Sequence, residues 1–101
     1  EKIERYILSI IAATRYPLEY GLDDKQRYIV SGASPRGTIY LAKAAKANAL
    51  LNGRAFVIPE DVQDVAVNVI AHRLILSYEA DIEKVTAETI IQHIIATLEV
   101  P

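Results

Sequence analysis

The sequence predicts an all-α domain built from four main helices, with at most a minor two-stranded β element. Apolar residues recur at helical spacing in four stretches, and each stretch is bounded by residues that favour helix starts or ends. Apolar residues make up 51% of the 101 residues and charged residues 24%, the composition of a packed domain and not of a disordered chain. Cysteine is absent, so neither a disulfide framework nor a thiolate metal site is expected.

The first helix is expected from about residue 2 to Thr14 or Arg15. Pro17 disfavours helical geometry at the residue before it, so the helix should end there. Five apolar side chains fall at i, i+3, i+4, i+7 and i+8 and predict one buried stripe: Ile3, Tyr6, Ile7, Ile10 and Ile11.

The stretch from Tyr16 to Ser31 shows no helical period, and we expect an irregular loop. It is long enough to suggest a partner contact, with an ordinary surface loop as the simpler interpretation. Residues 28–30 are β-prone and are expected to pair with the alternating apolar residues at 74–78. Asp23 and Asp24 lack a further pattern of oxygen ligands, so we interpret them as a solvated turn and not as a cation site.

The second helix is expected from Pro35 to about Leu51. Ser34 offers a capping oxygen, and proline suits the first helical position. Gly53 is placed to end the helix in the left-handed conformation. Small side chains in the middle of the helix predict a close contact with a neighbouring helix in the centre of the bundle: Ala42, Ala44, Ala45, Ala47 and Ala49.

Arg36 lies in the first turn of this helix, where the helix dipole favours an acid and not a cation. Lys43 follows seven residues later and therefore shares a face with Arg36, with Tyr40 beside them. Gly37 would allow a backbone or a ligand to approach closely. On spacing alone, a solvated polar face is the simpler interpretation, and phosphate recognition is the alternative.

The third helix is expected to begin at Pro59, with acids in its first turn, and to end near His72 and Arg73, where cations complement the dipole. For Arg73 a second interpretation stays open, that it faces a neighbouring domain. Ile58, just before the proline, has no capping oxygen. The predicted buried stripe consists of Val62, Val65, Ala66, Val69 and Ile70.

Residues 79–84 are expected to form a charged loop that leads into the last helix. Thr86 should cap that helix, and Val85 with Ile90 occupies the two positions of a hydrophobic staple. The predicted buried face of the helix consists of Ile90, Ile91, Ile94, Ile95 and Leu98.

Several classes of protein are disfavoured by the composition. A net charge of −2 and a pI of about 5.6 argue against a module held by nucleic-acid phosphates. No signal peptide or membrane-spanning stretch is visible, so a cytoplasmic location is expected. His72 and His93 lie on different helices without ligand spacing, so no metal site is expected. The chain has no GxxxxGK[ST] loop and no nucleophile–base pair, and thus no complete active site.

Five short motifs follow one another in the order GASPRG (32–37), AAKA (44–47), LNGR (51–54), PEDV (59–62) and HRL (72–74). This series resembles the C-terminal lid domain of MoxR-type AAA+ ATPases, and the resemblance extends from about Ile3 to Leu98. Ile58 departs from the family pattern, which usually has threonine or serine there. The resemblance implies a single lid domain over residues 1–101. Because the chain begins with Glu1 inside a helical pattern, we expect it to be a piece of a longer ATPase.

The resemblance also implies roles for particular residues. Arg36 matches the sensor-2 arginine, which reaches the ATP phosphates in the complete enzyme, and Ser34, Pro35 and Lys43 would lie on the same phosphate side. ATP and Mg²⁺ would be bound mainly by an N-terminal core domain that is not in this chain, so the fragment itself should neither hydrolyse ATP nor bind it tightly. Subunits of the family assemble into rings, usually hexamers, and act as chaperone-like remodelers that often insert metal cofactors into client proteins.

Two other classes remain open at the level of sequence. One is a stand-alone helical interaction module, which would expose an apolar patch for a peptide. The other is a helix-turn-helix nucleic-acid-binding module, which would show a steep dependence of binding on salt.

Overall fold

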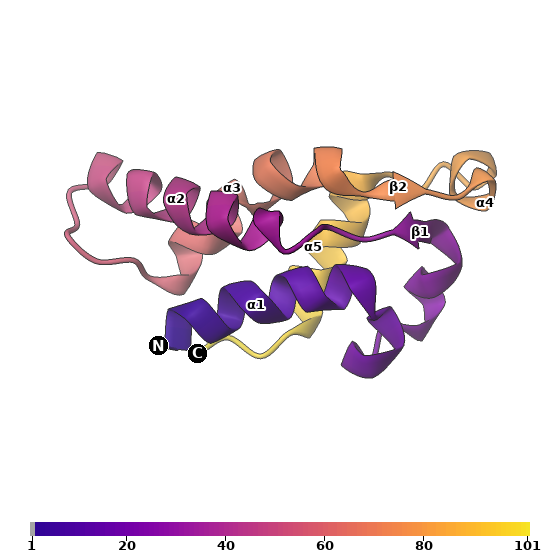
Figure 1. Cartoon of the computed structure of the whole chain (residues 1–101), viewed down its shortest axis with the longest axis horizontal. Helices are drawn as coiled ribbons and strands as arrows, with labels where there is room; N and C mark the ends of the chain where they lie inside the picture. Colours follow the sequence, from indigo (N-terminus) through magenta and orange to yellow (C-terminus); the bar gives the residue numbers. More distant parts are fainter. Residues whose placement is uncertain (1) are drawn as a thin grey trace.

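The computed structural model describes the backbone of residues 2–101 and the side chains of residues 2–22 and 26–101. The four predicted main helices are α1 (Lys2–Arg15), α2 (Arg36–Leu51), α3 (Pro59–Ile70) and α5 (Ala87–Thr97). They form an elongated body of 43 × 22 × 21 Å. α2 lies alongside α3, α1 runs along the opposite side, and α5 crosses the long axis steeply (Figure 1). The predicted all-α class is therefore confirmed.

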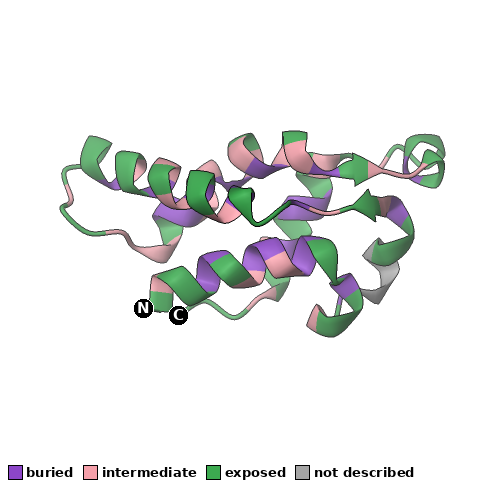
Figure 2. Cartoon of the chain, in the orientation of Figure 1, coloured by how far each residue is buried: buried purple, intermediate pink, exposed green. Residues whose placement is uncertain are grey.

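The core forms where α1 and α3 pack on α2 and α5 packs on α1 and α3. Buried residues line the facing sides of these helices, whereas the outer faces are exposed (Figure 2). The largest fully buried apolar side chains come from all four helices and the segment after α1: Ile10, Leu22, Leu41, Val62, Ile70, Ile90, Ile91 and Ile94. Other members of the predicted stripes are only partly buried and pack against this core: Ile3, Val65, Val69, Ile95 and Leu98.

α2 and α3 form the most extensive helix–helix contact among the described residues. Ala45 and Ala49 of α2 are buried there, whereas Ala47 faces outward, so the alanine-rich helix is central on one side only. Gly53 ends α2 with φ 76°, as predicted. The N–H of Gly53 donates to Leu50 O over 3.0 Å and that of Arg54 to Ala49 O over 2.9 Å, which is the hydrogen-bond pattern of a Schellman motif.

The start of α2 differs from the prediction. The helix begins at Arg36, with Pro35 as the capping residue, and no side chain caps it. Ser34 contributes its backbone carbonyl, which accepts from the Gly37 N–H over 2.8 Å, and not its hydroxyl. The tight turn through Ser34 and Pro35 already satisfies this amide, because Pro35 takes a helical conformation with φ −56°.

Between α1 and α2 the chain forms two 3₁₀ turns, η1 (Pro17–Tyr20) and η2 (Asp23–Tyr28), followed by β1 (Ile29–Ser31). β1 pairs antiparallel with β2 (Ile75–Leu76), as predicted, in the register Ile29–Leu76 and Ser31–Ile75 with an irregularity between the two pairs. The side chains of Asp23 and Asp24 lie outside the described residues, so the interpretation of a solvated turn stays a prediction.

The predicted charged loop at 79–84 is wrong. After the short turn η3 (Ala71–Arg73) and β2, residues Tyr78–Ile82 form the helix α4. The Ser77 hydroxyl caps it by accepting from the Ala80 N–H over 3.2 Å, and Ala80 is fully buried against the domain. The charged side chains belong to the outer face of this helix. Thr86 caps α5 through the Thr89 N–H, as predicted.

Candidate functional site

The turn that leads into α2 is fastened to the last turn of α1. Thr14 is fully buried; its hydroxyl donates to Ile11 O over 2.6 Å and accepts from the Ala33 N–H over 3.0 Å. Gly32 lies so close to the same turn that a Cβ there would stand 2.3 Å from the Thr14 carbonyl oxygen. The backbone just before Arg36 is thus held on α1 by a hydrogen bond and a contact that only glycine permits.

Arg36 is exposed at the first position of α2. Over the described part of the chain it forms no hydrogen bond or ion pair, and the first turn of α2 holds no acidic residue. Its guanidinium donors are therefore available to a group outside the domain. Arg36 thus lies in the first turn of α2, as the sequence predicted, and the backbone before it is held by the contacts of Gly32 and Ala33 with Thr14.

Gly37 serves the packing of the domain itself and does not create an opening for a ligand. The residue is buried, and a Cβ there would lie 3.1 Å from Ile11 Cδ1 and 3.8 Å from Arg73 Cδ. The close approach expected at this glycine is made by side chains of α1 and η3.

Arg73 stacks on the ring of Tyr40, with its guanidinium carbon 4.4 Å from the ring centroid. The sequence pattern allowed two interpretations of Arg73, a complement to the helix dipole or a residue that faces a neighbouring domain, and it did not predict Tyr40 as a partner. Tyr40 had been placed beside Arg36, but a contact with a residue so distant in sequence has no local pattern that could reveal it.

The other predicted site residues are placed in two different hollows. Ser34 and Pro35, both exposed, line a hollow of about 340 Å³ together with Arg15, Tyr16 and residues 30–33. Lys43 is exposed on a larger hollow of about 480 Å³ between α1 and α2. Chain continuity keeps residues 34–36 together, whereas Lys43 lies two helical turns further along.

Asp61 forms a polar centre that the sequence analysis missed. Although it is fully buried, it accepts from Asn48 Nδ2 and from the Ile58 N–H over 2.9 Å each, and it pairs with Arg54. Burial alone raises the pKa of Asp61, but these hydrogen bonds and the Arg54 charge outweigh burial and lower the pKa overall. The LNGR and PEDV motifs therefore meet in one structural network, and the Asp61 carboxylate supplies one half of a capping box by accepting from the Ile58 N–H, while Ile58 itself provides no side-chain cap.

A second polar cluster fastens η2 to α4. Tyr28 Oη donates to Glu83 Oε1 over 2.7 Å, and Arg27 Nε lies 3.2 Å from Glu79 Oε2. The hydrogen bond from Tyr28 lowers the pKa of Glu83, and it raises the pKa of Tyr28. This contact gives the segment between α1 and β1 a structural role within the domain.

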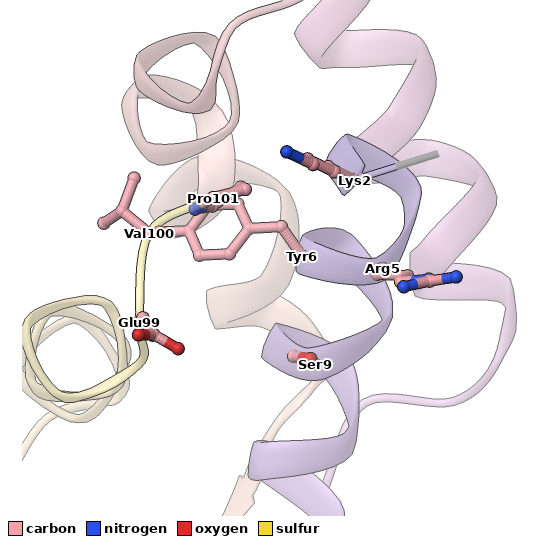
Figure 3. A pocket seen from close by; sticks show the side chains of 7 residues that line it. All are labelled: Lys2, Arg5, Tyr6, Ser9, Glu99, Val100 and Pro101. Atoms are coloured by element: carbon pink, nitrogen blue, oxygen red, sulfur yellow. The ribbon is translucent and has the colours of Figure 1, made fainter.

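A further hollow of about 300 Å³ lies between the start of α1 and residues 99–101 (Figure 3). Tyr6 reaches across it toward Val100 and Pro101, and its hydroxyl accepts from Gln63 Nε2 over 3.0 Å. Arg5 points away from this tail. Because the hollow adjoins the opposite end of α1 from Thr14, roughly 15–20 Å away along the helix, it is not part of the turn that presents Arg36.

Neither a metal centre nor a membrane span emerges from the described residues. They contain no group of three or more His, Cys, Asp or Glu side chains that could hold a metal ion. None of their helices combines the length and apolar character needed to cross a bilayer.

Comparison with known proteins identifies the fold. Residues 23–94 match the model of the AAA lid domain. The chain therefore belongs to the AAA lid domain family.

Its relatives include MoxR proteins, which confirms the resemblance to the MoxR-type lid. The chain is 36% identical to "Chaperone MoxR1" of Mycobacterium tuberculosis over 95% of its own length and 26% of that protein. It is 40% identical to "Protein MoxR" of Paracoccus denitrificans, over 98% of the chain and 31% of that protein. The solved structure of a protein from Cytophaga hutchinsonii, assigned as an ATPase, matches the whole chain at 42% identity with a TM-score of 0.96, over 31% of that protein. The chain thus spans between 26% and 31% of the length of these proteins.

Proposed function

We propose that this chain is the lid of a MoxR-type AAA+ ATPase, which closes over ATP held by a core domain and supplies Arg36 as the sensor-2 residue. The observation that carries the proposal is the unpaired guanidinium of Arg36, presented by a turn that Thr14 and Gly32 fix to α1. The family match and the short share of each relative that the chain covers support a second domain that binds most of the nucleotide.

The role of Arg36 follows from its chemistry. A guanidinium presents a planar set of N–H donors that fits two phosphate oxygens, and its charge stabilises negative charge that develops during phosphoryl transfer. Because the Arg36 backbone is fixed, only the Arg36 side chain has to be ordered when the lid closes. Ser34 and Pro35 form the same turn, and Lys43 would add a weaker attraction for phosphate from further along α2.

The core domain would supply the remaining chemistry. Mg²⁺ would accompany ATP there, since the described residues offer no set of carboxylates and histidines to hold it. The name of the Mycobacterium tuberculosis relative supports a chaperone-like machine. We extend to this chain the assembly into a ring, most simply a hexamer, acting on a client protein in the cytoplasm. Insertion of a metal cofactor into that client would be the specific task.

A specific observation also favours a protein-binding surface on α2. Leu50 is 69% exposed and Leu51 87% exposed at the end of the helix, and Phe56 in the following link is 66% exposed. Isolated exposed apolar residues are ordinary, but three that are close in sequence at one end of a domain suit a contact that excludes water. We assign this end to the neighbouring subunit of the ring.

The test of the proposed function uses the full-length ATPase that contains this domain. Replacement of Arg36 by alanine should lower the rate of ATP hydrolysis by about 100-fold, because one donor to the developing charge is lost. Arg36→Lys should recover only part of the rate, since an ammonium cannot form the planar two-oxygen contact.

Arg5→Ala is the matched control, because Arg5 is also an exposed arginine but lies at the far end of α1. It should leave hydrolysis unchanged, and the isolated 101-residue chain should show none. An Arg36→Ala enzyme that hydrolyses ATP at the wild-type rate would rule out the sensor role, and turnover by the isolated chain would rule out the division of labour between the domains.

A further inference from the structure

Two arginines from different elements lie at the first turns of α2. Arg36 opens the helix, and Arg73 arrives from η3. The stem of Arg73 passes beside Gly37, and its guanidinium covers the ring of Tyr40. Since Tyr40 follows Arg36 by four residues, the two share one face of α2, so the ring that holds Arg73 lies on the face that carries Arg36.

Neither of these two charges is paired with a carboxylate in the part of the chain that the structure describes. Among the described residues, the ion-paired arginines are Arg27, which meets Glu79 and Glu83, and Arg54, which meets Asp61; both hold the fold together. Arg36 and Arg73 have no carboxylate partner and no hydrogen bond in the same part of the chain. Like charges that gather on one surface repel each other, and an anion that binds between them removes that repulsion.

The contact between Arg73 and Tyr40 leaves the N–H donors of the Arg73 guanidinium free. Stacking engages the flat face of the guanidinium, whereas its N–H donors point outward in the plane. The Arg73 side chain is half-buried between Tyr40 and Gly37, so its position is restricted before any ligand arrives. A restricted cation with free donors loses little freedom when it binds a phosphate.

We propose that Arg73 is a second phosphate-binding cation of the closed nucleotide site and that Tyr40 is its positioning residue. The inference rests on the proposed function, since it requires that the face of α2 that carries Arg36 turns toward ATP. Together the two guanidinium groups bind the polyphosphate of a nucleoside triphosphate. ATP offers the lid one more phosphate than ADP, so ATP holds the lid closed more strongly.

The experiment measures binding of ATP, ADP and adenosine to the full-length protein by displacement of a fluorescent ADP analogue. Replacement of Arg73 by glutamine should weaken ATP binding by roughly tenfold, because a hydrogen bond between charged groups is lost. Binding of ADP should weaken less, and binding of adenosine should not change. Tyr40→Leu should reproduce part of the loss for ATP, whereas Tyr40→Phe, which keeps the ring, should bind ATP as the wild type does.

Two results would overturn the inference. One is unchanged ATP binding in Arg73→Gln. The other is an equal loss for all three ligands with a lowered unfolding temperature, which would make Arg73 a packing residue. Arg73→Lys, which keeps the stem and the charge, should then restore both the unfolding temperature and the binding of all three ligands.

Arg36→Ala in the same assay separates this failure from failure of the proposed function. If Arg36→Ala weakens ATP more than adenosine and Arg73→Gln does not, only the second cation is wrong. If neither change distinguishes ATP from adenosine, this face of α2 does not meet the nucleotide, and both proposals fail.

Discussion

The backbone of Gly32 lies directly against the end of α1. A Cβ at residue 32 would stand only 2.3 Å from the carbonyl oxygen of Thr14. The neighbouring Ala33 N–H donates to the Thr14 hydroxyl, so two independent contacts join the end of α1 to the start of α2. The backbone position of Arg36 therefore depends on contacts made by Thr14, which lies 22 residues earlier in the sequence.

Gly32→Ala should destabilise the domain by about 1–3 kcal/mol, because the added methyl group meets backbone that cannot move aside. The free energy of unfolding from urea titration measures this. Gly37→Ala is the control: its Cβ meets a side-chain end, Ile11 Cδ1 at 3.1 Å, and alanine is the better helix former. We expect it to change stability by less than about 1 kcal/mol. Equal effects of the two changes would mean that the contact with Thr14 is not the limiting one.

Ala45→Leu should overpack the contact between α2 and α3 and cost about 1–3 kcal/mol, since Ala45 is fully buried there. Ala47→Leu adds the same atoms to the exposed side of the same helix and should change stability by less than about 0.5 kcal/mol. Thermal unfolding of the two variants side by side provides the comparison. If both unfold with the parent, α2 is not packed as described.

Stability should fall at acidic pH in a way that depends on Asp61. Its pKa is lower in the folded domain than the value of about 3.9 in unfolded chains, so its stabilising contribution is complete above that value and is lost as pH falls toward the folded pKa. Asp61→Asn should be less stable at neutral pH, because Arg54 loses its charged partner, and should lose less further stability on acidification.

Urea unfolding at a series of pH values from neutral to acidic tests this. Glu60→Gln, a change of the exposed carboxylate next in sequence, should leave the pH dependence close to that of the parent. An Asp61→Asn variant that loses as much stability on acidification as the parent would show that other carboxylates dominate.

Leu51→Glu should separate folding from assembly. The side chain is 87% exposed, so the change should alter the stability of the isolated domain by less than about 0.5 kcal/mol. In the full-length protein it should shift the population from rings toward single subunits, as measured by analytical ultracentrifugation, because a charge enters the proposed subunit contact. Ile82→Glu, at the 62% exposed Ile82 of α4, should leave the assembly intact. Unchanged assembly in Leu51→Glu would place the subunit contact elsewhere.

Local patterns predicted much of the fold. The stripe of α1, the left-handed Gly53 and the Thr86 cap each depend on residues within one or two turns of chain, where spacing and backbone preference dominate. The pairing of β1 with β2 followed from two short β-prone runs. The error at α4 has a clear cause, because a five-residue helix with one fully buried side chain, Ala80, leaves almost no apolar period.

The candidate site was less predictable. Arg36 could be singled out because its motif is local, but the residues that fix it could not. In the sequence, Thr14 is only the last residue of an amphipathic pattern. Its hydrogen bond with the Ala33 N–H joins residues 19 positions apart, and the segment between them has no periodic pattern that could predict the contact. The stack of Arg73 on Tyr40 and the burial of Asp61 likewise arise only when separate elements pack together.

Because Gly32 and Ala33 are attached to Thr14, the start of α2 with Arg36 moves together with the last turn of α1. A helix of this length extends roughly 20 Å, so a tilt of about 10° around its first residue displaces its last turn by roughly 3–4 Å. A hydrogen bond tolerates less than about 1 Å of displacement, so such a tilt is several times larger than the motion that makes or breaks a phosphate contact. Under the proposed function, a small rotation of the whole domain is thus enough to make or break the contact between the Arg36 guanidinium and a phosphate, without any rearrangement inside the domain.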